Sequence, residues 1–371
     1  MSPTRPQNFP SSIDVYQESF QNWNWTIKAP NLWTCGPRSG ADVVAVCNWA
    51  AQEGYRVRAR GMMHTWSPLT VVDGTSPDAK VILVDTTKYL TGMSFAAGSG
   101  DLPPQVTVQT GATMEALLSF LEQQPGGQRA APGYSFPHTP APGKLTVGGV
   151  LAIDAHGSAI PSPADNFLAS YGSLSNQVLA FTAVVSDSSS PGAYTLKTFQ
   201  RGDPDAKAFL ANLGRAFLID ATLQVVDNYN LRCQSYTNIP NTTLFQQAAS
   251  GSPAPQRLAD FLNQSGRVEV IWYPFTNSSW LKVWTCTPDK PVGSIRVDSP
   301  YNYPFSDNVP DWVTTLIEKI TQGDGALTKE LGEFMKGLTD LGLTFCKDLW
   351  GPSKNTLLYV KDATLRVTAN G

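Results

Sequence analysis

Residues 58–67, RARGMMHTWS, place a histidine beside a tryptophan directly after a predicted strand. Gly61 permits a tight turn whose backbone amides can converge on an anion, and Arg60 adds a positive charge. Such a loop suits a pyrophosphate, with His64 as a ligand, a base or a point of covalent attachment. A surface turn with a packed histidine accounts for the same residues equally well.

A second glycine-rich segment, GKLTVGGVLAIDAHG, occupies residues 143–157. Gly148 and Gly149 open an apolar run, where they would let the backbone pack against a flat ligand, and His156 and Gly157 close it. Taken alone, the pattern favours a turn that leads into a buried helix. Because neither GxGxxG nor GxxxxGK[ST] occurs in the sequence, a Rossmann site and a P-loop are disfavoured.

A third segment, YGSLSNQV at residues 171–178, joins small residues and hydroxyls to an apolar strand. These residues could line the edge of a cofactor, and a capped turn explains them equally well.

Start and stop signals predict the elements that hold these segments in the first 230 residues. Ser39, with Asp42 three residues later, predicts a capped helix that ends at Gly54, and Thr113 predicts a helix from Met114 to about Gln124. Asp203 followed by Pro204 predicts a third helix that ends at Gly214. Strands are expected over residues 55–59, 81–85, 106–109, 179–186, 194–199 and 217–226.

The pattern changes after about residue 228. Aromatic-rich strands are expected over residues 267–275 and 280–286, followed by a loop over 288–304. Apolar residues at helical spacing predict a helix over 311–333, and partial alternation predicts a final strand over 357–367.

Composition limits the classes of protein that remain. The 371 residues are 42% hydrophobic and 15% charged with a net charge of −3, so the chain is globular and lacks the basic stripe of a nucleic-acid-binding protein. No apolar run approaches a membrane span, and residues 1–10 lack the apolar region of a signal peptide. The five cysteines are scattered without a CxxC pair, which indicates small core residues and not a metal or redox site.

In this order, the segments resemble the FAD-binding half of the vanillyl-alcohol-oxidase family of flavoproteins. The resemblance rests on PxxxxDVV at 37–44, RGxxHxW at 60–66, TVGG…HG at 146–157, YGSLSN at 171–176 and LGRAFLIDATLQV at 213–225. It implies FAD as cofactor, with His64 as the covalent attachment point, although a noncovalent FAD beside a packed His64 remains possible. The implied cofactor-binding residues are Arg60, Gly61, Met62, Met63, His64, Thr146, Gly148, Gly149, His156, Gly157, Tyr171, Gly172, Ser173 and Asn176.

The second half resembles the substrate-binding domain of bacterial cholesterol oxidases that carry covalent flavin. The matching stretches are RCQSYTNIP at 232–240, RVEVIWYPFTNSSWLKVW at 267–284 and PYNYPFSDN at 300–308. Their aromatic residues could line a wide apolar cavity for a four-ring lipid, or, for at least half of them, simply pack a core. These residues are Trp272, Tyr273, Phe275, Trp280, Trp284, Tyr301, Tyr303 and Phe305.

Glu269 is the candidate catalytic residue, because it lies between Val268 and Val270 on an apolar strand where burial would raise its pKa toward the range useful for proton transfer. By resemblance, a glutamate in this motif lies near the reacting alcohol. The alternative is a buried glutamate that pairs with Arg267 or Arg232. Of the other histidines, His138 is expected to be exposed in its proline-rich loop, and His156 to make a structural contact near the cofactor.

The resemblance breaks beyond Gly371. Family members are longer, and their later segment carries a Glu-x-Arg pair over the flavin that this sequence lacks. We therefore expect either a fragment or a natural C-terminal truncation.

The expected fold class is α+β: a two-lobed FAD-binding domain of the vanillyl-alcohol-oxidase type at residues 1–228, and a partial α+β substrate-binding domain at 229–371. The function implied by the resemblance is oxidation of a 3β-hydroxysteroid by O₂ to the 3-ketone with release of H₂O₂, followed by isomerisation to the 4-ene-3-one. The alternatives are a sugar or aldonolactone oxidase and an inactive flavin- or lipid-binding module. The implied partners are a sterol and, transiently, a membrane surface. The resemblance suggests secretion, and the sequence itself leaves the compartment open.

Overall fold

The computed structural model describes residues 5–23, 25–127, 131–163, 171–247, 256–301, 303, 319 and 327–358. The chain divides into two compact units. Unit 1 comprises Met1–Phe120, Gly143–His156 and Ser173–Val225, and unit 2 comprises Leu121–Pro142, Gly157–Gly172 and Val226–Gly371. Both units combine helices with sheets, so the expected α+β class is confirmed.

The first sheet of unit 1 has four strands in the order β1-β2-β4-β3. Its strands are β1 (Asp14–Gln21), β2 (Lys28–Gly36), β3 (Arg56–Arg60) and β4 (Val81–Asp85). The pairs β2–β4 and β3–β4 are parallel, and β1–β2 is antiparallel. All five side chains of β4 are buried, as its unbroken apolar sequence indicates. The strands predicted at 55–59 and 81–85 are confirmed.

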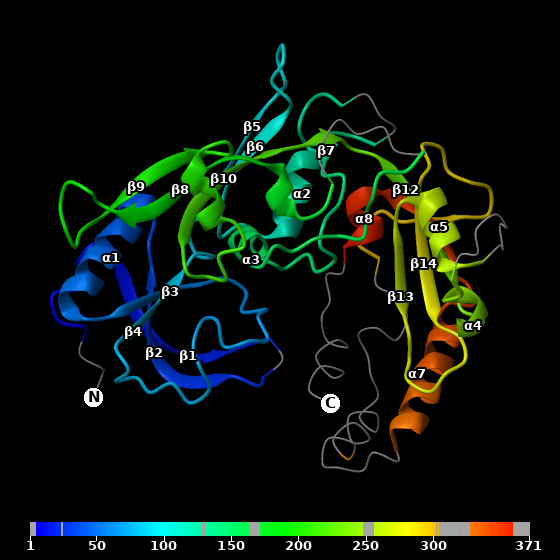
Figure 1. Cartoon of the computed structure of the whole chain (residues 1–371), viewed down its shortest axis with the longest axis horizontal. Helices are drawn as coiled ribbons and strands as arrows, with labels where there is room; N and C mark the ends of the chain where they lie inside the picture. The colour runs from blue at the N-terminus through cyan, green and yellow to red at the C-terminus, as the bar shows by residue number, and fades with distance from the viewer. Residues whose placement is uncertain are drawn as a thin grey trace. The chain divides into compact units, whose positions relative to one another are not determined.

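Helix α1 (Gly40–Glu53) covers this sheet (Figure 1). The Ser39 side chain accepts a hydrogen bond from the Asp42 backbone N–H at 3.2 Å, and Gly54 ends the helix with a φ of 73°. Val46 and Ala50 pack against strand β4 in one buried cluster. Both predicted ends of this helix are therefore confirmed.

The second sheet of unit 1 has five antiparallel strands in the order β5-β6-β10-β8-β9. They are β5 (Met93–Ala96), β6 (Gln105–Gln109), β8 (Val178–Ser186), β9 (Tyr194–Gln200) and β10 (Phe217–Gln224). The short helix α3 (Val147–Ala152) packs on β6 and β10, and η1 (Leu174–Gln177) leads into β8. Helix α2 (Met114–Glu122) begins after Thr113, as predicted.

The helix predicted from Asp203 to Gly214 is wrong in extent. Only a 3₁₀ helix, η2 (Pro204–Phe209), forms there. The Asp203 carboxylate accepts a hydrogen bond from the backbone N–H of Gln200 at 2.9 Å and makes no side-chain cap to the helix. Its side chain therefore closes the turn before the helix and does not extend the helix.

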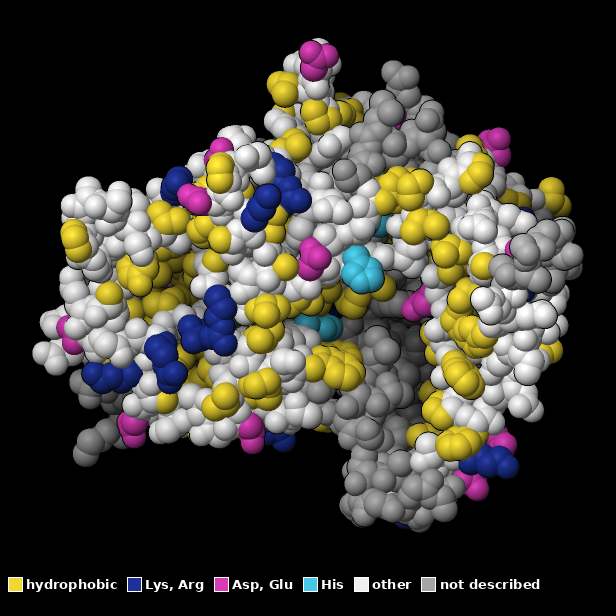
Figure 2. Space-filling model, viewed as in Figure 1, with side chains coloured by type: hydrophobic (Ala, Val, Ile, Leu, Met, Phe, Trp, Pro, Cys, Tyr) yellow, Lys and Arg dark blue, Asp and Glu magenta, His cyan; other side chains and the backbone are white. Residues whose placement is uncertain are grey.

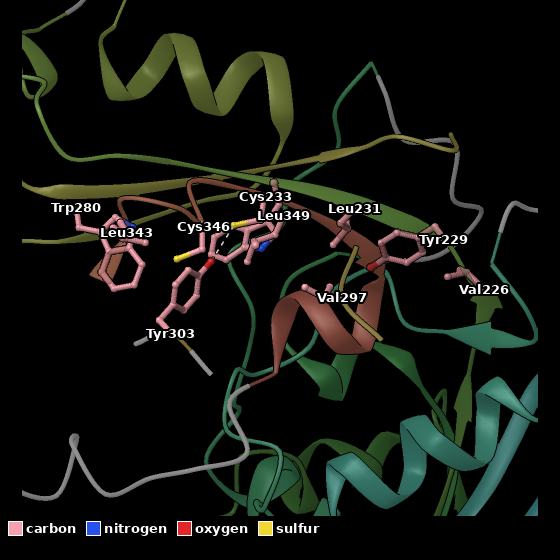
Figure 3. Close-up of a cluster of buried hydrophobic side chains, with 11 residues drawn as sticks. Val226, Tyr229, Leu231, Cys233, Trp280, Val297, Tyr303, Leu343, Cys346 and Leu349 are labelled. Carbon is pink, nitrogen blue, oxygen red and sulfur yellow. Dashed lines mark hydrogen bonds between the residues drawn. The ribbon is translucent and has the colours of Figure 1, made fainter. Parts of the chain in front are cut away.

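Unit 2 is built on a five-stranded sheet in the order β13-β14-β12-β16-β15. Its strands are β12 (Asn230–Tyr236), β13 (Val268–Ile271), β14 (Trp280–Cys286), β15 (Ile295–Arg296) and β16 (Asp348–Pro352). One face packs Leu281 and Val283 under α4 (Asn241–Leu244) and α5 (Leu258–Ser265). The other face carries a cluster with Cys233, Trp280 and Tyr303 (Figure 3). Unit 2 also contains a two-stranded ladder of β7 (Tyr134–Ser135) and β11 (Val226–Asp227).

The two elements predicted near the end of the chain are tested only in part, because most of their residues lie outside the described ranges. The helix expected over 311–333 lies mostly outside the described residues, and the described helix α7 (Thr328–Gly342) continues well past its expected end. The final strand expected over 357–367 is wrong at Leu357, which ends helix α8 (Ser353–Leu357), and residues 359–367 lie outside the described part. A short apolar run fits either a strand or a helix, and here the Leu358 N–H donates to the Lys354 carbonyl at 3.0 Å.

None of the five cysteines, all of which the structure describes, forms a disulfide bond, and Cys35, Cys47, Cys233 and Cys346 are buried, so the prediction of core residues is confirmed for these four. Within the described ranges, no helix has the length and apolarity needed to cross a membrane.

Candidate active site

Gly61 brings together two of the segments that the sequence singled out. A Cβ atom at Gly61 would overlap the Oγ1 atom of Thr146, so the backbone of the first loop lies directly on the start of the second glycine-rich segment. Thr146 caps helix α3 by accepting a hydrogen bond from the Gly149 N–H at 3.3 Å. A side chain at position 61 would therefore displace the Thr146 hydroxyl that makes this cap.

His64 is held in a stack of aromatic rings. Its imidazole lies on Trp23, with centroids 5.1 Å apart and planes 21° apart, and Trp66 stacks on the same indole at 5.9 Å. Trp23 is 7% exposed and its backbone N–H donates to the Met63 carbonyl at 2.7 Å. The buried Asn22 donates to the Thr65 carbonyl at 3.1 Å.

Trp23 and Asn22 were missed by sequence reasoning. They lie far from the loop in sequence, and the only available signal was the aromatic run around residues 23–25. Their contacts hold Met63 at a φ of 56°, a left-handed conformation that non-glycine residues rarely adopt. Such strain persists only where surrounding contacts enforce it, which makes the position of His64 a constrained one.

The Arg60 side chain pairs with two carboxylates of the first sheet. Its guanidinium forms ion pairs with Asp85 at 2.7 Å and Glu18 at 3.3 Å, and is only 15% exposed. The Arg60 carbonyl accepts a hydrogen bond from the Thr86 N–H at 3.1 Å. These contacts fix the start of the loop, while contact between this guanidinium and a cofactor stays a prediction.

The remaining predicted cofactor residues of unit 1 fall into two places. Gly148 lies against strand β6's end, where its N–H donates to the Thr110 carbonyl at 2.8 Å and a Cβ atom would be 2.9 Å from the Thr110 Cβ. Gly149, which follows Gly148, and Met62, which follows Gly61, are both exposed. Elsewhere, the exposed His156 forms a β-bridge with Ser173, and the Asn176 N–H donates to the Ser173 carbonyl at 3.0 Å.

Three predicted cofactor residues belong to unit 2: Gly157, Tyr171 and Gly172. A Cβ atom at Gly157 would lie 2.6 Å from the Thr139 carbonyl oxygen, so this glycine serves a close approach of two backbones. Gly172 is exposed with a φ of 109°, which also requires glycine.

Glu269 pairs across strands with Lys282 in the sheet of unit 2. The two residues are in register between β13 and β14, and their side chains form an ion pair. The Lys282 side chain is fully buried, whereas that of Glu269 is 36% exposed. The Lys282 ammonium lies over the rings of Trp280 at 4.7 Å, Trp284 at 5.4 Å and Tyr303 at 5.6 Å.

The alternative partners expected for Glu269 have other contacts. Arg232 donates to the Asp348 carboxylate at 2.9 and 2.5 Å, and the buried Arg267 donates to the Pro137 carbonyl at 2.9 Å. The expectation of an arginine partner is therefore corrected to a lysine. Alternation along residues 280–284, WLKVW, was a usable signal, because it places the lysine on the face that carries both tryptophans.

The predicted cavity aromatics separate by burial. Trp280, Trp284 and Tyr303 are buried in the cluster of the sheet, and the Tyr303 hydroxyl is 3.4 Å from the Cys233 sulfur (Figure 3). Trp272 and Phe275 are 57% and 65% exposed. Figure 2 shows hydrophobic side chains on the surface of the part of the molecule that holds β14 and α7. Phe305 lies outside the described residues. Core packing thus accounts for the first three, and a sterol cavity stays a proposal.

His138 is buried, with 1% exposure, so its expected exposure was wrong. The Tyr229 hydroxyl donates to the carbonyls of Phe136 at 2.8 Å and Pro137 at 3.2 Å, and the Arg267 guanidinium donates to the latter as well. Two buried side chains, Tyr229 and Arg267, therefore hold this proline-rich loop in the interior through three hydrogen bonds, which its composition alone does not predict.

Two families of known domains match this chain. Residues 34–189 match the family described as FAD binding domain, and residues 230–371 match the family described as cholesterol oxidase, substrate-binding. A solved structure titled solvent-stable cholesterol oxidase shares 52% identity with a TM-score of 0.89, covering 98% of this chain and 66% of its own. The chain belongs to the cholesterol oxidase family.

A second member of the cholesterol oxidase family, the enzyme from B. sterolicum, is 41% identical with a TM-score of 0.89, over 99% of this chain and 65% of its own. The chain thus spans slightly less than two thirds of the length of these family members. No curated protein matches it.

The glycine-rich segments of unit 1 fit the FAD of this family. A Cβ atom at Gly61 would meet Thr146, and one at Gly148 would meet Thr110, so these two glycines let the loop after β3, the start of α3 and the end of β6 pack closely together. The residues present are therefore compatible with the FAD-binding domain that the family match identifies.

Proposed function

We propose that the protein oxidises the 3β-hydroxyl group of a sterol with O₂, giving the 3-ketone and H₂O₂. The family match of residues 230–371 and the printed names of two solved relatives support cholesterol as the substrate class. The proposed division places the FAD-binding domain at residues 1–228 and the substrate-binding domain at 229–371, close to the two matched ranges.

In this proposal, backbone amides of the loop at Gly61–His64 hold the FAD pyrophosphate, and the segment from Thr146 to Gly149 supports that loop. When bound, FAD accepts the hydride from the carbinol carbon of the substrate. Arg60 fixes the first loop through Asp85, and the stack of Trp23 on His64 orients the imidazole. His156, Gly157, Tyr171, Gly172, Ser173 and Asn176 are proposed to complete the cofactor site.

The observation that carries the catalytic assignment is the ion pair of Glu269 with Lys282 beside buried aromatic rings. A carboxylate has only acceptor oxygens, and the Lys282 ammonium holds this one in place. Glu269 is therefore proposed to take the hydroxyl proton as the hydride leaves, so that the C–H and O–H bonds break and the C=O bond forms. The partial exposure of its side chain leaves the carboxylate accessible to a substrate.

For a substrate with a 5,6 double bond, we extend this role to isomerisation. The carboxylate removes a proton from C4 of the 5-ene-3-one and the carboxyl group returns it to C6, which gives the conjugated 4-ene-3-one without net change of protons.

The experiment is to mix purified, flavin-loaded protein anaerobically with cholesterol and follow the yellow absorbance of the flavin. Bleaching by cholesterol, its return with O₂ and formation of H₂O₂ are expected, with no response to a panel of sugars and aldonolactones. If only a sugar bleaches the flavin, the proposal of a sterol oxidase is wrong and the protein is a sugar or aldonolactone oxidase. If no substrate bleaches it, the protein is a flavin-binding module without this activity.

The variant Glu269→Gln tests the proton acceptor. We expect oxidation to fall by about 100-fold or more, whereas Glu333→Gln, at an exposed glutamate of helix α7, should keep full activity. Unchanged oxidation and isomerisation in Glu269→Gln would remove Glu269 from the mechanism.

His64 is proposed as the covalent attachment point of the flavin. After acid precipitation, the yellow colour should stay with the pellet of the unmodified protein and of His156→Ala, but not with that of His64→Ala. A colourless pellet from the unmodified protein, or a modified peptide that lacks His64, would contradict the attachment.

A further inference from the structure

Lys282 is an unusual lysine because its side chain is fully buried in the sheet of unit 2. Burial of an ammonium costs several kcal/mol unless other charges and dipoles replace the lost water. Two kinds of partner do so here: the Glu269 carboxylate, and the faces of Trp280, Trp284 and Tyr303 within 4.7 to 5.6 Å of the Lys282 nitrogen.

The sheet explains why these groups meet. Trp280, Lys282 and Trp284 alternate along β14 and so point to one face, and the cross-strand neighbour of Lys282 on β13 is Glu269. On the other side of β14, Lys282 is opposite Ser235 of β12, whose hydroxyl accepts a hydrogen bond from the Trp280 indole at 3.0 Å. The aromatic rings are thereby fixed, and they in turn fix the ammonium.

We propose that Lys282 is a positioning residue of the oxidation, which holds the Glu269 carboxylate in one orientation from within its aromatic enclosure. This inference rests on the proposed function. The side chain of Lys282 cannot move without displacing the buried Trp280 and Trp284. Its ammonium therefore restricts the Glu269 carboxylate to one position. The ion pair prepares Glu269 to accept a proton before any substrate binds.

The pH dependence isolates this pair from its neighbours. Cys233, Tyr273 and Tyr303 are described titratable groups that interact electrostatically with Glu269 or Lys282. Burial raises the pKa of the Cys233 thiol to about 12, and burial also raises the pKa values of Tyr273 and Tyr303 above that of an ordinary tyrosine. All three therefore stay neutral between pH 5 and 9, roughly the range of an assay.

The experiment compares Lys282→Met, which keeps the unbranched apolar stem without the ammonium, with Lys282→Arg, which keeps the charge. For Lys282→Met we expect kcat for cholesterol to fall by about 100-fold with a smaller change in KM. The acidic limb of the pH–rate profile should move to higher pH, because the carboxylate loses its cationic partner. Lys282→Arg should restore the position of that limb at least in part.

The matched control is Lys336→Met, because Lys336 is also a largely buried lysine of unit 2 and pairs with Asp340 on helix α7 at 2.7 Å. It should lose stability without any change in the pH–rate profile. A folded Lys282→Met with the profile and kcat of the unmodified protein would overturn the proposal, as would the same profile shift in Lys336→Met.

A second measurement keeps the inference separate from the sterol assignment and from poor folding. A double-mutant cycle with Glu269→Gln and Lys282→Met reports the coupling of the pair in urea unfolding, whatever the substrate. If no sterol is oxidised but the coupling is present, the proposed function fails and the ion pair stands. If sterol is oxidised but the unfolding free energies of the two variants are additive, the positioning role fails. Should Lys282→Met not fold, the double variant and Lys282→Arg carry the same comparison.

Discussion

The imidazole of His64 stacks on the indole of Trp23, with ring centroids 5.1 Å apart and planes 21° apart. The stack joins the loop after β3 to the segment after β1, which also donates two hydrogen bonds to the same loop. The position of His64, which the motif predicted, thus depends on Trp23, which sequence reasoning missed.

Trp23→Ala should destabilise the protein by about 3–5 kcal/mol and release the loop. The reason is that Trp23 is buried and carries both His64 and Trp66 on its ring. Urea unfolding measures the loss, and the ratio of flavin retained after acid precipitation measures the effect on His64. Trp66→Ala, at a tryptophan that is 55% exposed, is the control and should cost much less. Equal losses in both variants would show that the stack does not hold the loop.

Gly61→Ala should lower flavin content and stability together. The added methyl group overlaps Thr146 Oγ1, and a shift of that hydroxyl would break the cap of helix α3, which alone costs about 1 kcal/mol. Flavin absorbance per protein and the melting temperature measure the two effects. Gly202→Ala, where no atom lies within 4 Å of the new Cβ, should be near neutral. Full flavin content in Gly61→Ala would contradict the close contact of the two segments.

Tyr229→Phe should cost about 1–3 kcal/mol, because its hydroxyl is a buried donor to the carbonyls of Phe136 and Pro137. The free energy of urea unfolding measures this loss. Hydrogen exchange should also rise locally around residues 134–140. Tyr194→Phe removes a hydroxyl from an exposed tyrosine and is the control, with little expected change. Unchanged protection of that loop in Tyr229→Phe would mean that Arg267 alone secures it.

Stability should fall at alkaline pH through the buried thiols. Burial raises the pKa of Cys233 from 9.0 to about 12 and that of Cys47 to about 11. Between the unfolded and folded values, the folded state binds more protons than the unfolded state, so the free energy of unfolding decreases as pH rises. This contribution is fully present below pH 9 and is lost between 9 and 12. Urea unfolding of Cys233→Ala should show a shallower decline over this range than the unmodified protein, and equal slopes would refute the assignment.

Local sequence signals predicted the helices and strands whose ends or faces depend on residues close together in the chain. Ser39, Asp42 and Gly54 fix helix α1 because a capping hydroxyl and a left-handed glycine act over a few residues. The unbroken apolar run of β4 and the alternation of β14 are equally local properties. The prediction failed at Asp203, whose carboxylate turned to an earlier N–H, and at Leu357, where a short apolar run fitted two structures.

By itself, the sequence predicted glycines and histidines for the flavin segments and determined that Glu269 lies on a strand, because motifs and alternation depend on neighbouring residues. Only the tertiary structure decided what these residues contact. The partner of Glu269 is Lys282 through strand pairing, His64 lies on Trp23, and His138 is buried by donors from Tyr229 and Arg267. Such contacts join residues distant along the chain, and their choice depends on strand register and packing, which no local pattern encodes.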